Sequence, residues 1–312
     1  MVVVFFGTPP FAVPTLSHLL ASRHRINGVV TQPDRGRGRG QKISDAPVKA
    51  LAVERSIPVI QPERLRDPAV ADTLRSWTPD IGVVVAYGRL IPDSLLDIPR
   101  HGMINVHASL LPKYRGAAPV HRAVINGEGV TGVTVMRVAT QLDAGDMFAR
   151  ATKAIGPEET SEEAERELAQ LGATLLVNVL DAIEAGTATE EAQDHTIATY
   201  APKITRADGL IDWRLSALDI HNRVRGLYPW PHAFTWLDGS RVIVLRTRVE
   251  SGLSSVEPGT VVEVTRDSIH VATGDQGRLA IIELQPEGRR PMRVRDYLAG
   301  RPLAPGARFT TP

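Results

Sequence analysis

The stretch Val2-Val3-Val4-Phe5-Phe6-Gly7 is a continuous run of apolar residues that ends in a glycine. A parallel strand covered on both faces shows such a run, whereas a half-buried strand alternates apolar and polar residues. The run therefore predicts a buried strand. Thr8-Pro9-Pro10 follows it, and the apolar residues from Phe11 to Leu20 indicate a helix. Strand, glycine turn and helix in this order are typical of the first βα unit of a doubly wound sheet.

The turn after this strand contains Gly7 as its only glycine. It lacks the G-x-G-x-x-G fingerprint, in which further glycines let the backbone approach a pyrophosphate and pack the helix against the strand. We therefore expect that no dinucleotide binds at this turn.

Strands continue to alternate with helices as far as Gly186. Residues 26–30, 57–60, 81–86, 103–107, 132–138 and 147–155 have strand composition, and residues 46–56, 67–77 and 119–126 indicate helices. Thr160-Ser161-Glu162-Glu163 fits a capping box, so a longer helix begins there and ends at Gly186. Strands that alternate with helices in this way predict an α/β fold.

The pattern changes in the last third of the chain. Residues 186–207 are polar and weakly patterned, as in an interdomain linker. Beyond them lie a short helix at 216–225 and short strands at 241–249, 259–264, 269–273 and 279–284. Short strands separated by turn residues predict a small β-barrel or sandwich. Because 312 residues exceed what one core usually serves, we expect two domains, 1–189 and 207–312, with a linker at 190–206.

The composition is that of an ordinary globular protein, with 43% hydrophobic and 23% charged residues and a formal net charge of +1. No apolar run reaches the length of about 20 residues that spans a bilayer. Met1 to Phe6 lacks the basic region of a signal peptide. Cysteine is absent, which excludes disulfides, a thiolate nucleophile and a Cys-based metal site. We therefore expect a cytoplasmic protein that holds no metal.

A basic loop rich in glycine follows the second predicted strand. It carries Arg35, Arg37, Arg39 and Lys42. Glycine keeps a loop flexible, and the arginine fork suits bidentate contact with phosphate. We expect the loop to contact phosphate or an RNA backbone, the alternative being a solvated loop with no partner. Residues 203–312 also hold more basic than acidic residues, which indicates either an anionic partner or a chance feature of a solvated surface.

The stretch from Ile104 to Pro119 combines polar side chains with the end of a strand. Side chains alternate between the two faces of a strand, so Asn105 and His107 share a face. Pro112 cannot donate a hydrogen bond to a sheet, so the strand ends before it. A donor and a titratable imidazole at a strand end form a candidate reaction centre. Taken alone, however, the pair is better explained as satisfied polar residues, and Asp143 as turn chemistry.

Several motifs, read together, resemble those of one family. They are Phe6-Gly7-Thr8-Pro9, Thr31-Gln32-Pro33-Asp34-Arg35, Val84-Val85-Ala86-Tyr87-Gly88, Ile104 to Pro119, Leu142-Asp143-Ala144-Gly145-Asp146-Met147, Ile211-Asp212-Trp213 and Pro229-Trp230-Pro231. Over nearly its whole length the chain resembles the methionyl-tRNA formyltransferases, which belong to the superfamily of 10-formyltetrahydrofolate-dependent formyltransferases. The S-L-L-P-x-Y-R-G element is specific to that superfamily, and the basic loop with the C-terminal β module indicates its tRNA-directed branch.

The resemblance implies a Rossmann-like catalytic domain with a mostly parallel sheet, followed by a smaller OB-like β-barrel domain that binds tRNA. It implies that the formyl group of 10-formyltetrahydrofolate is transferred to the α-amino group of initiator methionyl-tRNA. The product, N-formylmethionyl-tRNA, serves translation initiation. The folate is then a co-substrate and the tRNA is the partner. We expect a monomer that does not associate with membranes.

The resemblance also assigns roles to residues. Its catalytic residues fall on Asn105, His107 and Asp143. Its folate-binding residues fall on Ser109, Leu110, Leu111 and Pro112, and on Ala86, Tyr87 and Gly88. Its tRNA contacts fall on Arg35, Arg37, Arg39, Lys42 and Lys203, with Arg39 in the place of the family's key loop arginine. Gly36-Arg37 and Gln41 depart from the commoner form of this loop, which leaves the roles of the individual arginines open.

These residue types suit acyl transfer to an amine, which passes through a tetrahedral oxyanion. A preorganised hydrogen-bond donor beside that oxygen contributes about 2.7–4 kcal/mol to catalysis, and the Asn105 amide fits this role. His107 fits the transfer of a proton, and an adjacent Asp143 would orient the imidazole. Because a neutral amine is itself a nucleophile, we expect direct transfer without a formyl-enzyme.

Three other functions stay open at this point. A related formyltransferase that acts on an amino sugar nucleotide or on glycinamide ribonucleotide would share the core motif, although the basic loop and the second domain argue against it. A hydrolase that releases formate would share the motif too. A non-catalytic RNA-binding relative would need only the basic loop, and the presence of Asn105, His107 and Asp143 weighs against it.

Overall fold

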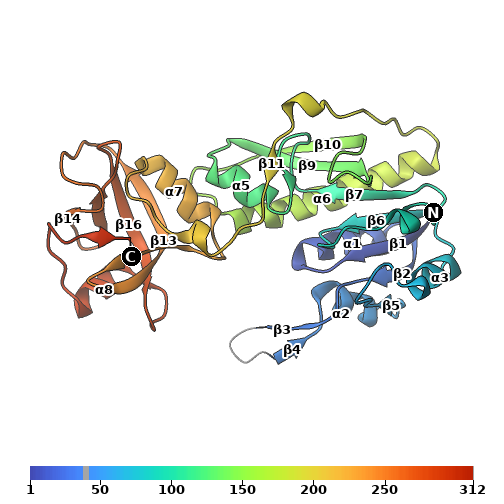
Figure 1. Ribbon diagram of the computed structural model, residues 1–312, viewed down its shortest axis with the longest axis horizontal. Coiled ribbons are helices and arrows are strands. Elements are labelled where there is room, and N and C mark those ends of the chain that lie inside the picture. The colour runs from blue at the N-terminus through green and yellow to red at the C-terminus, as the bar shows by residue number, and fades with distance from the viewer. Residues whose placement is uncertain (38–41, 312) are drawn as a thin grey trace. The chain divides into compact units, whose positions relative to one another are not determined.

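The computed structural model describes residues 1–37 and 42–311, which fold as two compact units (Figure 1). The first unit comprises Met1–Pro119, Val130–Lys153 and Glu165–Ala201. The second unit comprises Val120–Gly129, Ala154–Ala164 and Pro202–Pro312. The functional division into a catalytic domain, a linker and a tRNA-binding domain stays a prediction.

A seven-stranded sheet forms the centre of the first unit. Its strands run in the order β10-β9-β7-β6-β1-β2-β5. They are β1 (Val2–Gly7), β2 (Arg25–Val30), β5 (Val59–Ile60), β6 (Ile81–Val85), β7 (Met103–His107), β9 (Val130–Arg137) and β10 (Met147–Ala154). The five strands from β7 to β5 pair in parallel, and β9 pairs antiparallel with β7. The predicted α/β fold with a mostly parallel sheet is confirmed.

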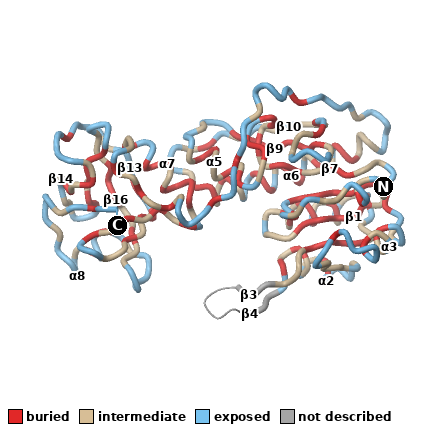
Figure 2. Tube along the Cα trace, in the orientation of Figure 1, coloured by how far each residue is buried: buried red, intermediate tan, exposed pale blue. Residues whose placement is uncertain are grey.

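The apolar run at β1 lies near the middle of this sheet and is buried on both faces, as Figure 2 shows. Val3 and Phe5 belong to one core, and Val4 and Phe6 belong to another. The first core also contains residues of α1 (Val13–Ala21), α2 (Pro47–Glu54) and α6 (Ser161–Glu184). The second core contains residues of α3 (Pro68–Ser76) and α4 (Asp93–Leu96). Helices on both faces of the sheet explain why the run does not alternate.

Side chains cap several helices where the sequence indicates a start. At α6 the Thr160 N–H donates to Glu163 Oε2 at 2.8 Å, and the Glu163 N–H donates to Thr160 Oγ1 at 3.3 Å. The predicted capping box is therefore confirmed. At α7 (Ala217–Gly226) the Asp219 N–H donates to Ser216 Oγ at 3.0 Å. These contacts satisfy backbone donors that have no partner within the helix.

The second unit is built around a curled antiparallel sheet, a half-barrel. Its order is β14-β15-β16-β13-β12-β18, and β17 pairs with β16. The strands are β12 (Ala233–Leu237), β13 (Ser240–Glu250), β14 (Val261–Val264), β15 (Ile269–Ala272), β16 (Arg278–Pro286), β17 (Met292–Arg293) and β18 (Phe309–Thr310). The helices α7 and α8 (Val294–Gly300) contribute to its core. The predicted β-rich second domain is confirmed, although β12, β17, β18 and α8 were not predicted.

The polar segment expected to be a linker belongs to the first unit as far as Ala201. Glu191 pairs with Met147, and β11 (Tyr200–Ala201) pairs in parallel with β8 (Arg115–Gly116). Backbone and polar side-chain contacts anchor this segment. Because such contacts leave no hydrophobic pattern in the sequence, they were not predicted. Within the described part of the chain, no helix combines the length and the apolar character needed to cross a membrane.

The central position of β1 makes a prediction about stability. Phe5 is fully buried, so Phe5→Ala should lower the free energy of unfolding by about 3–5 kcal/mol through lost burial and the cavity left behind. Urea denaturation monitored by circular dichroism measures the change. The control is Val53→Ala on α2, where the side chain is 57% exposed and we expect a change within about 0.5 kcal/mol. Equal, small effects of both substitutions would contradict the assignment of β1 to the core.

Candidate active site

The carboxyl end of β7 carries Asn105 and His107. Asn105 aligns with Val84 on β6 and with Met136 on β9, and His107 aligns with Thr134 on β9. The alternation of the strand places both polar residues on one face. His107 is buried, whereas Asn105 is half-buried. No partner within hydrogen-bonding distance of the Asn105 amide is found among the described residues, so this amide is free to serve a ligand.

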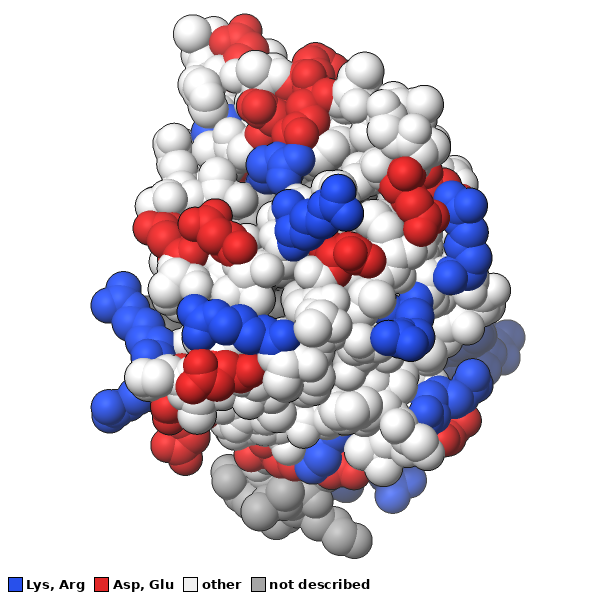
Figure 3. Space-filling model, turned by 90° about the vertical axis from the view of Figure 1, so that its right-hand side faces the viewer, with Lys and Arg blue, Asp and Glu red and all other residues white. Residues whose placement is uncertain are grey.

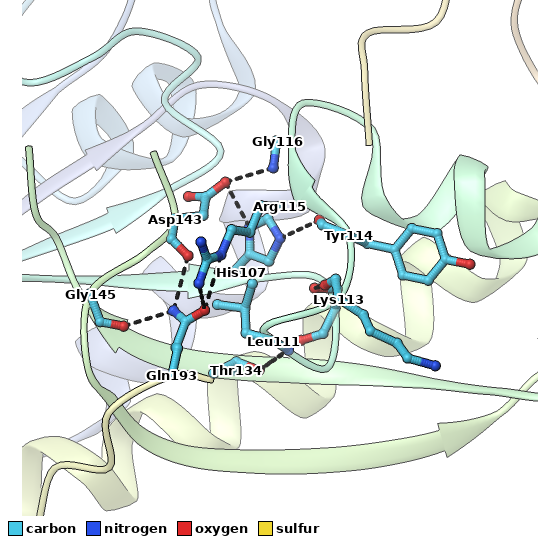
Figure 4. A network of polar contacts seen from close by, with 11 residues as sticks. His107, Leu111, Lys113, Tyr114, Arg115, Gly116, Thr134, Asp143, Gly145 and Gln193 are labelled. Carbon is cyan, nitrogen blue, oxygen red and sulfur yellow. Dashed lines mark hydrogen bonds and ion pairs between the residues drawn. The ribbon is translucent and has the colours of Figure 1, made fainter. Parts of the chain in front are cut away.

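The His107 imidazole lies between two acceptors. Its Nε2 is 2.9 Å from the backbone oxygen of Tyr114, so Nε2 carries a proton and donates it. Its Nδ1 is 3.6 Å from Asp143 Oδ2. Figure 4 shows the carboxylate directed toward the imidazole, while the Tyr114 ring and the Lys113 ammonium extend away from it. The contacts fix the plane of the ring and leave Nδ1 beside the carboxylate.

Asp143 lies in a tight turn between β9 and β10. Its φ is +49°, a left-handed conformation that few residues other than glycine adopt. The Gly116 N–H donates to its Oδ2 at 2.8 Å. Gly145 in the same turn leaves no room for a side chain, since a Cβ there would lie 2.1 Å from the Arg137 oxygen. Asp143 is therefore held at a fixed place opposite His107.

The segment Ser109 to Pro112 forms a compact turn after β7. Ser109 Oγ donates to the Lys113 oxygen at 2.6 Å. Thr134 Oγ1 donates to the Ser109 oxygen at 2.7 Å and accepts from the Leu111 N–H at 3.2 Å. Ser109, Leu111 and Pro112 are buried, while Leu110 is partly exposed. Sequence reasoning did not identify Thr134, which links this turn to β9.

The segment Ala86 to Gly88 follows β6. Tyr87 is 1% exposed, and burial raises the pKa of its phenol. Its backbone oxygen accepts a hydrogen bond from Gln32 Nε2 at 2.6 Å. Ala86 and Gly88 are exposed. A ligand at this segment would therefore meet its backbone rather than the Tyr87 ring.

Two further polar residues surround Asp143. Arg115 is buried and donates from Nε and Nη2 to Gln193 Oε1. Gln193 Nε2 donates to the backbone oxygens of Asp143 and Gly145. Neither residue was predicted to belong to the site, and Gln193 lies in the segment expected to be a linker. The polar composition around Gln193 offered no signal for its role.

The basic loop begins as a hairpin. Its strands are β3 (Arg35–Arg37) and β4 (Lys42–Ser44), which pair antiparallel. Asp34 stands at its base and accepts hydrogen bonds from the Ala46 N–H at 3.2 Å, from Gln61 Nε2 at 3.0 Å and from the Lys49 ammonium. The hydrogen bond from Lys49 lowers the pKa of Asp34. The base of the hairpin is therefore held by a charged contact.

Two further residues, Arg39 and Lys203, were predicted to contact tRNA. Arg39 lies outside the described residues. Lys203 is exposed and belongs to the second unit. Basic and acidic side chains are interspersed on the face shown in Figure 3. That face therefore offers no patch of a single sign, in keeping with the small net charge.

Within the described residues, three side chains have the spacing of a metal site. The ligand atoms of His24, Asp181 and Glu184 lie within 4.8 Å of one another. Arg23 already contacts Asp181 at 2.7 Å and Glu184 at 2.9 Å. Burial also lowers the pKa of His24. The carboxylates are thus engaged by a guanidinium, and we assign no metal to this group.

Comparisons with known proteins identify the families that the chain resembles. Residues 1–180 match the model of the formyl transferase family, and residues 203–302 match that of the formyl transferase C-terminal domain. A methionyl-tRNA formyltransferase from Geobacter sulfurreducens is 47% identical over 309 residues, which cover 98% of this chain and 96% of the relative.

Solved structures show a similar fold. The sugar 3N-formyl transferase WlaRD, solved in the presence of dTDP and 5-N-formyl-THF, has a TM-score of 0.69 at 16% identity and covers 93% of this chain and 99% of its own. A variant of HypX from Aquifex aeolicus has a TM-score of 0.66 at 16% identity. The match covers 96% of this chain, which spans about half (48%) of the HypX chain.

The family models together cover most of the chain, and the identity to the Geobacter relative extends over nearly all of it. The similarity to the solved structures shows that the fold is that of formyltransferases. The chain therefore belongs to the formyltransferase family and, within it, to the methionyl-tRNA formyltransferases.

Proposed function

We propose that this enzyme transfers the formyl group of 10-formyltetrahydrofolate to the α-amino group of initiator methionyl-tRNA. The observation that carries the proposal is the contact between His107 and Asp143 at the end of β7, the strand that also carries Asn105. It occurs in a chain 47% identical to a methionyl-tRNA formyltransferase. The product is N-formylmethionyl-tRNA, the substrate of translation initiation.

The residues at this site suit each part of the reaction. The amine nitrogen forms a bond to the formyl carbon, and the carbonyl oxygen becomes an oxyanion that the Asn105 amide stabilises. The bond from the formyl carbon to N10 of the folate then breaks, and N10 takes up a proton. The amine loses a proton in the same sequence. His107, paired with Asp143, moves these protons within the site.

The folate co-substrate would lie against the two segments that flank the reaction centre, Ala86 to Gly88 and Ser109 to Pro112. Both follow strands of the parallel sheet, and ligands of open α/β sheets bind beyond the carboxyl ends of the strands. The exposed backbone around Gly88 and the partly exposed Leu110 support this placement. Among relatives of similar fold, WlaRD was solved in the presence of a formyl-THF.

The tRNA would be held by electrostatic contacts outside the reaction centre. We assign these to the hairpin residues Arg35, Arg37, Arg39 and Lys42, and to Lys203 in the second unit. The anchor at Asp34 supports this role because it fixes the base of the hairpin. We further propose that the protein is cytoplasmic and monomeric, and sedimentation of the purified protein checks its oligomeric state.

A panel of acceptors tests the proposed function. The assay supplies 10-formyltetrahydrofolate with methionyl-initiator tRNA, methionyl-elongator tRNA, a dTDP-amino sugar, glycinamide ribonucleotide or water alone. We expect transfer to methionyl-tRNA at the highest kcat/KM. Preference for the sugar nucleotide, for the ribonucleotide or for water would instead establish one of the alternative functions.

Substitution of the central residues should affect chemistry rather than folding. Asn105→Ala removes the oxyanion donor and should lower kcat by about 10²–10³-fold. Asp143→Ala should also lower kcat, because the His107 ring loses its partner. Steady-state kinetics, with circular dichroism as the check on folding, measures both effects. Activity close to that of the wild type in either folded variant would contradict the assignment.

Neutralising the hairpin should weaken tRNA binding and its dependence on salt. Each phosphate contact contributes about 0.9 to the slope of log K against log salt for duplex DNA, and we expect duplex RNA to behave comparably. Arg35→Gln with Arg37→Gln should therefore reduce the slope by up to about 2. Filter binding at several salt concentrations measures it. Arg75→Gln, an exposed position on α3, serves as the control, and equal slopes in both proteins would exclude the hairpin from binding.

A further inference from the structure

Arg115 is unusual because it is 1% exposed and has no acidic partner among the described residues. Its Nε and Nη2 donate to Gln193 Oε1 at 3.1 and 2.6 Å, and Nη2 lies 3.0 Å from His195 Nδ1. No carboxylate among the described residues comes within the 4.0 Å of an ion pair. A buried charge is costly unless it is hydrogen-bonded. The Gln193 oxygen, which takes two of these contacts, therefore carries much of the compensation.

The other end of the Gln193 amide holds the turn that contains Asp143. Its Nε2 donates to the Asp143 oxygen at 2.9 Å and to the Gly145 oxygen at 2.7 Å. An amide oxygen accepts two hydrogen bonds and an amide nitrogen donates two, so every position of Gln193 is used. In the reverse orientation, the amide nitrogen would face the Arg115 donors, and the amide oxygen would face the oxygens of Asp143 and Gly145. The contacts therefore fix the orientation of this amide.

Two adjacent residues of β8 hold Asp143 through hydrogen bonds. The Gly116 N–H binds the Asp143 carboxylate directly at 2.8 Å. Arg115 reaches the Asp143 backbone through Gln193, as Figure 4 shows. This double attachment restrains the residue at φ +49°, a left-handed conformation that aspartate adopts more readily than most residues.

We propose that Gln193 and Arg115 are positioning residues for formyl transfer, which hold the Asp143 carboxylate against His107 through the backbone of the turn. The inference rests on the proposed function, because it assigns the pair a role in that reaction. Neither residue belongs to the segments that we assign to folate or tRNA. Their loss should therefore lower kcat and leave the KM of both substrates nearly unchanged.

Gln193→Glu separates positioning from simple packing. The glutamate has nearly the same shape and still accepts from Arg115, so the protein should fold. Its urea midpoint should fall somewhat, because the second carboxylate oxygen then faces the oxygens of Asp143 and Gly145. It cannot donate to the oxygens of Asp143 and Gly145. Because a displacement of about 1 Å at a reaction centre costs on the order of 10²-fold, we expect kcat to fall by that order. Gln193→Met, which neither donates nor accepts, is the second variant and should lower kcat at least as far.

A double-mutant cycle tests whether the effect passes through Asp143. The variants Gln193→Glu, Asp143→Ala and their combination are compared with the wild type in the formylation of methionyl-tRNA. If Gln193 acts through Asp143, the double variant should be no more than about twofold slower than Asp143→Ala, since coupled residues are not additive. The matched control is Gln170→Glu, the same change at an exposed position of α6.

Each outcome decides between stated alternatives. Wild-type protein that does not formylate methionyl-tRNA would overturn the proposed function. An active wild type with unchanged kcat in both folded Gln193 variants would overturn the positioning role. Full additivity of Gln193→Glu with Asp143→Ala would also overturn it, as would a failure of both Gln193 variants to fold, which would make the residue purely structural.

Discussion

The carboxyl ends of parallel strands must lie at one edge of their sheet, and the candidate site depends on this constraint. The loops that leave this edge are also tied to one another. The Gln32 N–H donates to Thr8 Oγ1 at 3.2 Å, and Gln32 Nε2 donates to the Tyr87 oxygen at 2.6 Å. These bonds join the ends of β1, β2 and β6, beside the end of β7. Burial of β1 on both faces thus fixes the frame on which the polar residues are displayed.

Polar groups at this edge support one another before any ligand arrives. The Tyr114 oxygen and the Asp143 carboxylate face the two nitrogens of His107, and the Gly116 N–H holds that carboxylate. The Asn105 amide has no hydrogen-bond partner within the described residues. A preorganised site stabilises a transition state without reorganising at the moment of reaction. In the proposed transfer, the Asn105 amide would serve the oxyanion while the remaining groups are already held in place.

Much of this arrangement follows from local patterns in the sequence. The unbroken apolar run at β1, the capping box at Thr160 and the alternation that aligns Asn105 with His107 each have a local physical cause. The approach of Asp143 to His107 has none, because it depends on the path of the chain, and only the family resemblance predicted it. Gln193 was missed because it contacts backbone oxygens from a polar segment. Helix α8 was missed because it buries only Val294 and Tyr297.

The most direct test of the central claim is a single turnover with 10-formyltetrahydrofolate labelled in the formyl carbon. Enzyme in excess over methionyl-tRNA is quenched at short times, and the label is followed in the protein, the tRNA and free formate. Direct attack by the amine at the Asn105, His107 and Asp143 centre predicts that the label passes from folate to methionyl-tRNA with none bound to protein. A labelled enzyme that forms and decays fast enough to account for turnover, or label released mainly as formate, would contradict it.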